Sequence, residues 1–258
     1  MVLYQYYNAD LLDIPDDNSD TAVTYVDNTL LYAEADTFEE AHLKLTEMMT
    51  KENRVAKWSK EHNSPLEYSK LALIDFAHHS NPQKPNPLQL PLREVKPSDS
   101  VRYLGVIFDC NLNWKAQHTH TVKKGAKWAA QIQRIARSSW GITPKYTRHL
   151  FISIALPRIL YAVNLWCTPV DKTHAGPKGR GLAKVTKQIT TIQRAAALAI
   201  TGGLKTSPND MLNSCAFLPP AALTINKWCF RVYIRMLMLP KEHPLHRIVT
   251  RKNNYNTK

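Results

Sequence analysis

Apolar and β-branched residues form two short runs, one on each side of a polar break near residue 27. The first run ends at Tyr25-Val26, and a second apolar run follows Thr29. Two such runs around a two-residue break are typical of a β-hairpin, so we expect its turn at Asp27-Asn28. A carboxylate at the tip of a rigid hairpin suits a hard cation. An ordinary hairpin with a turn aspartate would have the same pattern.

The rest of the chain divides into a mixed first part and a helical second part. Alternation predicts strands over residues 68–76 and 101–108, separated by a loop at 78–99 that holds five prolines. We therefore expect an α+β fold in which the strands stop near residue 112. Helical spacing and caps predict helices over residues 1–13, 38–58, 118–139, 143–166 with a bend at Pro157, 182–200, from Ser207-Pro208, and after Pro219-Pro220.

Charge divides the chain more sharply than hydropathy does. Residues 1–40 hold ten Asp and Glu and no Lys or Arg, whereas residues 111–258 hold 24 Lys and Arg and three acidic residues. Such a basic half is the electrostatic footprint of a polyanion binder, and nucleic acid is the first candidate. A solvated basic surface, or a patch for acidic proteins or membranes, remains an alternative.

The sequence gives little indication of secretion, disulfide bonds or a zinc site. The N-terminus has no basic region or small-residue cleavage site, and no apolar run is long enough to span a membrane, so we expect a cytosolic or nuclear protein that is not secreted. The four cysteines form no Cys-x-x-Cys pair, which favours reduced thiols. Cys110 with His118 and His120 lacks an evident fourth zinc ligand, and no signal indicates a small-molecule cofactor.

The hairpin string Tyr25-Val26-Asp27-Asn28 resembles the Tyr-x-Asp-Asp box of reverse transcriptases, and the following Thr29-to-Asp36 segment resembles LINE-type (non-LTR) retrotransposons, fungal ones especially. In that family a carboxylate trio holds two Mg²⁺ ions, with two aspartates from the hairpin and one from motif A. The resemblance implies that Asp27 is a catalytic metal ligand and that Asn28 is a degenerate second position.

Two further segments extend the resemblance. Asn63 and Lys70, after the helix of residues 38–58, resemble motif D, whose lysine assists proton transfer to the leaving pyrophosphate. A strand-edge lysine is the alternative for Lys70. Tyr103-Leu104-Gly105-Val106, followed by Asp109, Leu112 and Trp114, is similar to the primer-grip motif E.

The basic helices that follow match the order of a polymerase thumb. The resemblance therefore implies the C-terminal part of a palm over residues 1–112, a helical thumb-like region over 113–240 and a polar tail over 241–258. Motif A and the fingers have no counterpart, and we expect them upstream of residue 1. The candidate contacts with an RNA or DNA template-primer are Tyr103, Leu104, Gly105, Lys123, Lys124, Lys127, Arg134, Lys184, Lys187 and Arg194.

Three functions are consistent with these residues. The first is a reverse transcriptase fragment that is inactive alone, because the carboxylate set is incomplete. The second is a non-catalytic nucleic-acid-binding module that uses the basic helices. The third is a polymerase that becomes active when another chain supplies motif A and the fingers. Salt-dependent binding and complementation would distinguish them.

Overall fold

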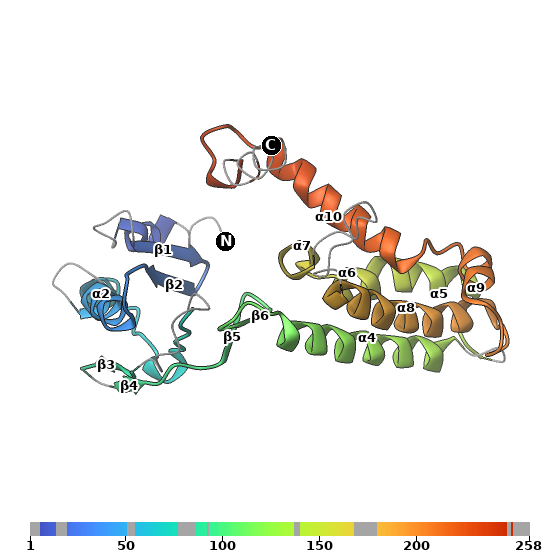
Figure 1. Cartoon of the computed structure of the whole chain (residues 1–258), viewed down its shortest axis with the longest axis horizontal. Coiled ribbons are helices and arrows are strands. Elements are labelled where there is room, and N and C mark those ends of the chain that lie inside the picture. Colours follow the sequence, from blue (N-terminus) through green and yellow to red (C-terminus); the bar gives the residue numbers. More distant parts are fainter. Residues whose placement is uncertain are drawn as a thin grey trace. The chain divides into compact units, whose positions relative to one another are not determined.

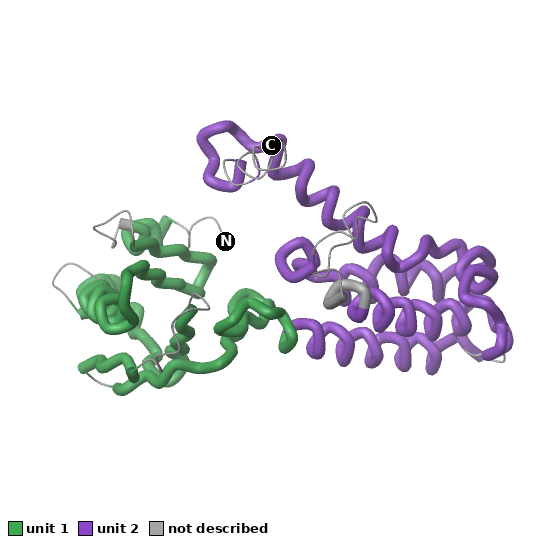
Figure 2. The backbone as a smooth tube through the Cα atoms, in the orientation of Figure 1, with its two compact units in different colours: residues 1–116 green, residues 117–258 purple. Residues whose placement is uncertain are grey.

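The computed structural model describes residues 6–13, 20–50, 55–76, 86–91, 93–136, 140–167, 180–246 and 249, with the backbone alone at 13 and 180–183. The chain forms two compact units, residues 1–116 and 117–258, coloured green and purple in Figure 2. Strands in the first unit and helices in the second make the fold α+β. None of the described helices combines the length and the apolar character needed to cross a bilayer.

The described residues of unit 1 form three small antiparallel hairpins, two α-helices and two short 3-10 helices (Figure 1). Each sheet has two strands, paired as β1-β2, β3-β4 and β5-β6. The elements are η1 (Ala9–Asp13), β1 (Asp20–Tyr25), β2 (Asn28–Ala33), α2 (Phe38–Thr50), α3 (Val55–Glu61), η2 (Tyr68–Lys70), β3 (Leu88–Leu90), β4 (Arg93–Val95), β5 (Ser100–Tyr103) and β6 (Val106–Asp109).

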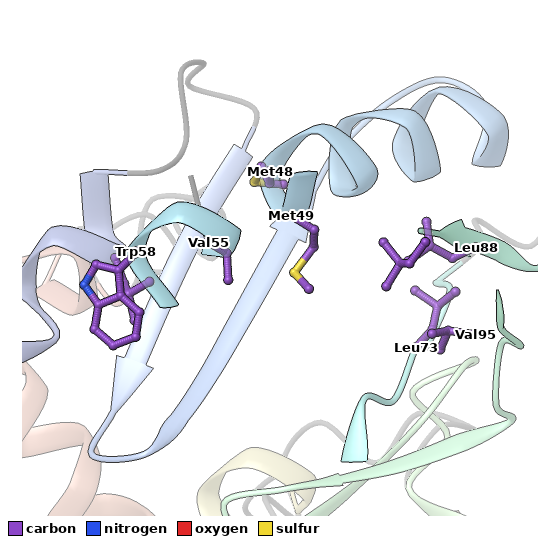
Figure 3. Packing of buried hydrophobic residues seen from close by; sticks show 9 residues of the cluster. Met48, Met49, Val55, Trp58, Leu73, Leu88 and Val95 are labelled. Carbon is purple, nitrogen blue, oxygen red and sulfur yellow. The ribbon is translucent and has the colours of Figure 1, made fainter. Parts of the chain in front are cut away.

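A single apolar cluster supports the β1-β2 hairpin. It links α2 and α3 to the short strands β3 and β4, and Figure 3 shows its side chains following one another from Trp58 past Met48 and Met49 to Leu88 and Val95. Met48 is fully buried, which contributes about 1.5–3 kcal/mol relative to an exposed side chain. Leu31 and Ala33 of β2 pack against this cluster and so fix one face of the hairpin.

The segment before β1 is fixed to α3 by aromatic contacts. The ring of Tyr7 lies edge-on to Trp58, with 5.6 Å between centroids, and Trp58 stacks on His62 at 4.7 Å. The Tyr7 hydroxyl donates a hydrogen bond to the backbone carbonyl of His62. These contacts hold the neighbouring residue Asn8 in a buried position beneath the hairpin tip.

The described secondary-structure elements of unit 2 are all helices. Helix α8 ends at Thr201 and is followed by Gly202, whose positive φ of 66° suits a glycine C-cap. Pro208 and Pro220 stand directly before α9 and α10. The elements are α4 (Lys115–Ile135), which begins at the end of unit 1, α5 (Pro144–Leu150), the π-helical segment η3 (Phe151–Ala155), α6 (Leu156–Ile159), α7 (Val163–Trp166), α8 (Arg180–Thr201), α9 (Asn209–Cys215) and α10 (Ala221–Leu237).

A side chain of α8 packs directly on a glycine of α4. Gly125 is buried, and a Cβ atom built on it would lie 2.5 Å from Cδ1 of Ile192. Farther along, the side-chain amide of Gln133 donates to the carbonyl of Ala195. Polar contacts fix the α9–α10 corner, because the buried Gln193 donates to Pro219 O at 2.8 Å and Arg148 donates to Ala216 O at 3.0 Å.

Several expected elements have different forms. The prediction of a strand over 68–76 is wrong. Tyr68–Lys70 is the 3-10 helix η2, and Leu73 makes only an isolated parallel bridge with Pro97. Proline lacks the N–H group that would continue the ladder. The strand over 101–108 is a hairpin that turns at Leu104-Gly105. Within the expected loop at 78–99, residues 88–95 form the β3-β4 hairpin.

Helix boundaries also differ. The expected helix over 1–13 contains the 3-10 segment η1, and that over 38–58 is described as α2 and α3. The chain is helical from α5 through η3 to α6, and the break comes at Ala162, with φ 51°, instead of Pro157. Pro157 follows the π-helical segment, where altered hydrogen bonding accommodates its missing donor. The sequence also predicts a basic loop over residues 168–181, of which 168–179 lie outside the described residues and 180–181 begin α8. Most of the tail after 246 lies outside the described residues as well.

Candidate functional site

The tip of the β1-β2 hairpin carries Asp27 and Asn28, but the turn is one residue earlier than expected. Tyr25 pairs with Asn28, so Val26 and Asp27 are the central turn residues and Asn28 begins β2. Both Asp27 and Asn28 are exposed. The side-chain amide of Asn28 donates to Oδ1 of Asp27 at 3.1 Å. An aspartate at position 28 would offer a second acceptor and a second negative charge instead of this donor.

The tip is held from below by a residue that the sequence did not point to. The buried Asn8 donates from Nδ2 to the carbonyl oxygen of Val26 at 2.6 Å. Val26 has a φ of 57°, a left-handed conformation that β-branched residues rarely adopt. This hydrogen bond ties the strained turn to the segment fixed on α3, so the position of Asp27 depends on contacts far away in the sequence.

Lys70 lies within electrostatic reach of Asp27. Its ammonium group pairs with Glu67 Oε2 at 2.5 Å. The hydrogen bond with Glu67 and the charge of Glu67 raise the pKa of Lys70, and the carboxylate of Asp27 adds a smaller contribution in the same direction. The same hydrogen bond lowers the pKa of Glu67. The carboxylate of Asp27 therefore contributes to the electrostatic environment of Lys70 in the folded chain.

The donor set at the tip does not fit a Mg²⁺ pair. Across the described residues, no group of three His, Cys, Asp or Glu side chains is placed to hold a metal ion. Asp27 supplies one carboxylate, and its Oδ1 already accepts from Asn28. Mg²⁺ requires nearly octahedral oxygen coordination and is commonly held by more than one acidic group.

The outward face of the hairpin is apolar and exposed. Val23 and Tyr25 of β1 and Leu30 and Tyr32 of β2 project from the face opposite Ala22 and Leu31. This face was not among the features predicted from the sequence. The alternation itself contained the signal, since both alternating sets of positions in β1 and β2 hold apolar side chains.

The Tyr103-Leu104-Gly105 segment forms the turn between β5 and β6. Leu104 and Gly105 both have positive φ, 45° and 84°, which is the pattern of a type I′ hairpin turn. Leu104 is partly exposed at this turn. The Tyr103 hydroxyl is buried, has no hydrogen-bond partner among the described residues, and has a pKa raised by burial.

The basic candidates of unit 2 differ in what they contact. Arg194 is engaged, because its guanidinium donates to the side chain of Asn209 and, at 2.7 Å, to the carbonyl of Lys205. It therefore fixes the turn after α8. Lys124 is partly buried. The remaining candidates are exposed: Lys123, Lys127 and Arg134 on α4, and Lys184 and Lys187 on α8.

The exposed lysines and arginine lie on two helices without acidic residues. Neither α4 nor α8 contains Asp or Glu. Lys123, Lys127 and Arg134 follow one another at four and seven residues, so they share one face of α4. Their charges are not neutralised within their own helix, and the arrangement can attract a polyanion.

A buried pair in unit 1 also escaped the sequence analysis. His42 Nε2 lies 3.0 Å from Asp75 Oδ1, and both side chains are about nine-tenths buried. The pair joins α2 to the extended segment after η2. The second carboxylate oxygen of Asp75, Oδ2, is buried without a hydrogen-bond partner among the described residues. Moving the segment away from His42 would also leave Oδ1 without this contact, so the pair helps to hold the segment in place.

Comparison with known proteins gives one relevant similarity. The chain is 28% identical over 79 residues to a retrovirus-related Pol polyprotein from the type-1 retrotransposable element R1 4 of Nasonia vitripennis. The match covers 31% of this chain and 20% of that protein, so the chain matches about a fifth of its relative's length. No protein-family model and no solved structure matches. The similarity supports a relationship to retrotransposon proteins.

Proposed function

We propose that the chain is a fragment of a non-LTR reverse transcriptase whose palm is incomplete and which does not polymerise DNA by itself. The observation that carries this proposal is the hairpin tip, where Asp27 stands exposed and the neighbouring amide donates to its carboxylate. Two-metal catalysis of nucleotidyl transfer needs several fixed carboxylate oxygens. One carboxylate with an amide neighbour falls short of that requirement.

Lys70 supports assignment of the hairpin to a polymerase palm. In the proposed site it is the proton donor near the leaving pyrophosphate. Its ammonium group is protonated at neutral pH and so carries a proton to donate, while the pairing with Glu67 raises its pKa and makes it a weaker acid until that pair opens. The contribution of Asp27 to that pKa supports the view that both residues belong to one site.

Primer extension tests the proposal. We expect no templated synthesis by the chain with Mg²⁺ or Mn²⁺ above an Asp27→Ala control. Extension upstream by fingers and a motif A segment, combined with Asn28→Asp, should give activity that Asp27→Ala abolishes. Activity of the short chain after Asn28→Asp alone would contradict the proposal.

The same assay separates truncation from substitution. Equal, robust activity of the extended protein with Asn28 and with Asn28→Asp would show that the second aspartate is dispensable. Activity restored by the upstream segment as a separate chain would favour complementation. The β1-β2 sheet leaves room for that outcome, because its two strands pair only with one another among the described elements and keep unpaired outer edges.

A second candidate, nucleic-acid binding without catalysis, is favoured by the exposed basic residues of α4 and α8. Phosphate contacts by lysine and arginine supply affinity that does not depend on base sequence. Such binding does not depend on the carboxylates that hold the catalytic metal ions. Binding that is retained in the Asp27→Ala protein is its expected signature.

A further inference from the structure

Helix α10 has a second apolar face that points away from its own unit. Its inner face, with Ile225 and Cys229, is buried where α10 packs on α7 and α8. On the opposite side an outward stripe, defined by its exposed apolar side chains, runs the length of the helix. The outward stripe comprises Leu223, Phe230, Ile234, Leu237 and Met238, which are 37% to 80% exposed.

The stripe is regular and rigidly supported. Its residues are separated by seven, four, three and one positions, which places them within about 100° of arc on a helix. The inner face anchors α10, since Ile225 is fully buried and the Cys229 thiol lies 3.7 Å from the carbonyl oxygen of Cys167. In Figure 1 the C-terminal half of α10 extends away from helices α5, α6, α8 and α9 of unit 2.

A row of cations begins within the stripe and leaves it along one side. Lys227, Arg231 and Arg235 are exposed and follow one another at steps of four residues. Lys227 lies in the gap between Leu223 and Phe230, and the two arginines continue along one border of the stripe. Asn226 and Tyr233, which are uncharged, border the other side. Helix α10 contains no acidic residue. An apolar seam with cations along one border is complementary to a helix with its own apolar seam and anions along the facing border.

We propose that the outward stripe of α10 docks an amphipathic helix of a separate protein that carries acidic residues beside its apolar seam. Apolar burial along the seam would supply affinity, and Lys227, Arg231 and Arg235 would select the acidic flank. This interaction is independent of polymerase chemistry and of the hairpin site.

Two other occupants fit the surface less well. A second copy pairing α10 with α10 would bring three cations of one helix against three of the other, and like charges disfavour that contact. A helix lying on an anionic bilayer carries a broad charged face opposite its apolar side. In α10 the opposite side is the buried inner face, and the two arginines border only one edge of the stripe.

Titration with a designed peptide tests the proposal on the full chain. The probe is a helical peptide of about 21 residues with leucine at the a and d positions and glutamate at e and g, which also limits its self-association. We expect saturable binding by fluorescence anisotropy. Phe230→Ser with Ile234→Ser should weaken it at least about ten-fold, because central apolar contacts carry most interface energy. Leu204→Ser, a change at a 74% exposed apolar residue outside α10, should leave it unchanged.

A charge exchange tests the acidic flank. Arg231→Glu should weaken binding of the glutamate peptide and strengthen binding of the same peptide with lysine at e and g. Lys205→Glu, an equal charge change at an exposed residue outside α10, should alter neither. Circular dichroism and thermal melts would show that the variants are folded.

Several results would overturn the proposal. Equal binding of the glutamate peptide by wild type and the Phe230→Ser, Ile234→Ser protein would show that the stripe is not the docking surface. Stripe-dependent binding to phosphatidylserine vesicles without peptide binding would assign the stripe to membranes. A dimer in light scattering that these substitutions dissociate, again without peptide binding, would assign it to a second copy.

Discussion

Val26 has a backbone conformation that is unfavourable for a β-branched residue. Its φ of 57° lies in the left-handed region, where non-glycine residues are strained by about 1–3 kcal/mol. Glycine reaches that region freely. We therefore predict that Val26→Gly stabilises the protein by up to about 1 kcal/mol, measured by denaturant unfolding of the full chain.

The matched control for that prediction is Val23→Gly. Val23 is an exposed valine in the interior of β1, where glycine should destabilise by about 0.5–1 kcal/mol. Opposite signs for the two substitutions are expected. A loss of stability in both would mean that the entropy cost of glycine and the lost contacts of the Val26 side chain outweigh the relief of backbone strain at the turn.

Lys70 gives a prediction about pH. The partner Glu67 raises the pKa of Lys70, and the pair lowers the pKa of Glu67. The stabilisation from their pair is therefore complete between the two unfolded pKa values. It disappears as the pH rises through the folded value of Lys70 or falls through that of Glu67. Glu67→Gln should lower the pKa of Lys70 in an NMR titration of its Cε and Nζ signals. Asp27→Asn should lower it by less. A larger effect from Asp27→Asn would mean that the hairpin carboxylate, not Glu67, controls the lysine.

At the scale of single elements, local signals predicted helices better than strands. The C-terminus of α8 follows from Gly202, and the N-termini of α9 and α10 follow from Pro208 and Pro220. Each of these signals lies next to the helix that it bounds, so no distant contact is needed to recognise it. The β5-β6 hairpin was read as one strand because apolar residues continue through Leu104. Its turn depends on the conformation of Leu104 and Gly105.

The hairpin turn shows why register is harder to predict. The sequence placed the turn at Asp27-Asn28, and the structure places it at Val26-Asp27. Aspartate and asparagine are common turn residues, whereas valine is not. The deciding interaction comes from Asn8, which lies outside the hairpin. No pattern within residues 20–33 encodes that contact, so the sequence identified the candidate carboxylate, Asp27, without its exact setting.

The α4–α8 contact gives a prediction at the same scale. Alanine at position 125 would gain about 0.5–1 kcal/mol in helix propensity, but its Cβ would lie 2.5 Å from Ile192 Cδ1. Overpacking costs about 1–3 kcal/mol, so we expect Gly125→Ala to destabilise the protein by about 1 kcal/mol.

A double-mutant cycle tests the cause of that destabilisation. Ile192→Val removes Cδ1 and alone should cost about 0.5–1.5 kcal/mol. In the Ile192→Val background, Gly125→Ala should become neutral or stabilising. Additive effects in the denaturation cycle would show that alanine clashes with something other than Ile192.

At the scale of the whole molecule, charge is divided as the backbone is. Residues 1–116 hold 11 basic and 18 acidic residues, a net charge of −7, whereas residues 117–258 hold 23 basic and three acidic residues, a net charge of +20. Sequence sufficed for this asymmetry because it is a property of composition. It could not separate Arg194, which fixes a turn, from the exposed Lys123 and Lys127. That distinction requires tertiary contacts.

The charge division leads to the last prediction, on binding of RNA and duplex DNA. The exposed lysine and arginine side chains of α4 should contact phosphates. A plot of the logarithm of the affinity against the logarithm of the salt concentration should therefore have a slope of about −0.9 for each phosphate neutralised on duplex DNA. Lys123→Glu with Lys127→Glu should weaken binding at low salt and make the slope less steep by about 1.8. Lys60→Glu with Lys96→Glu makes the same change in net charge on exposed residues of unit 1 and should have a much smaller effect. Filter binding across a salt series measures both quantities. Equal losses in the two double variants would mean that net charge alone governs binding, and affinity that does not change with salt would exclude phosphate contacts as its source.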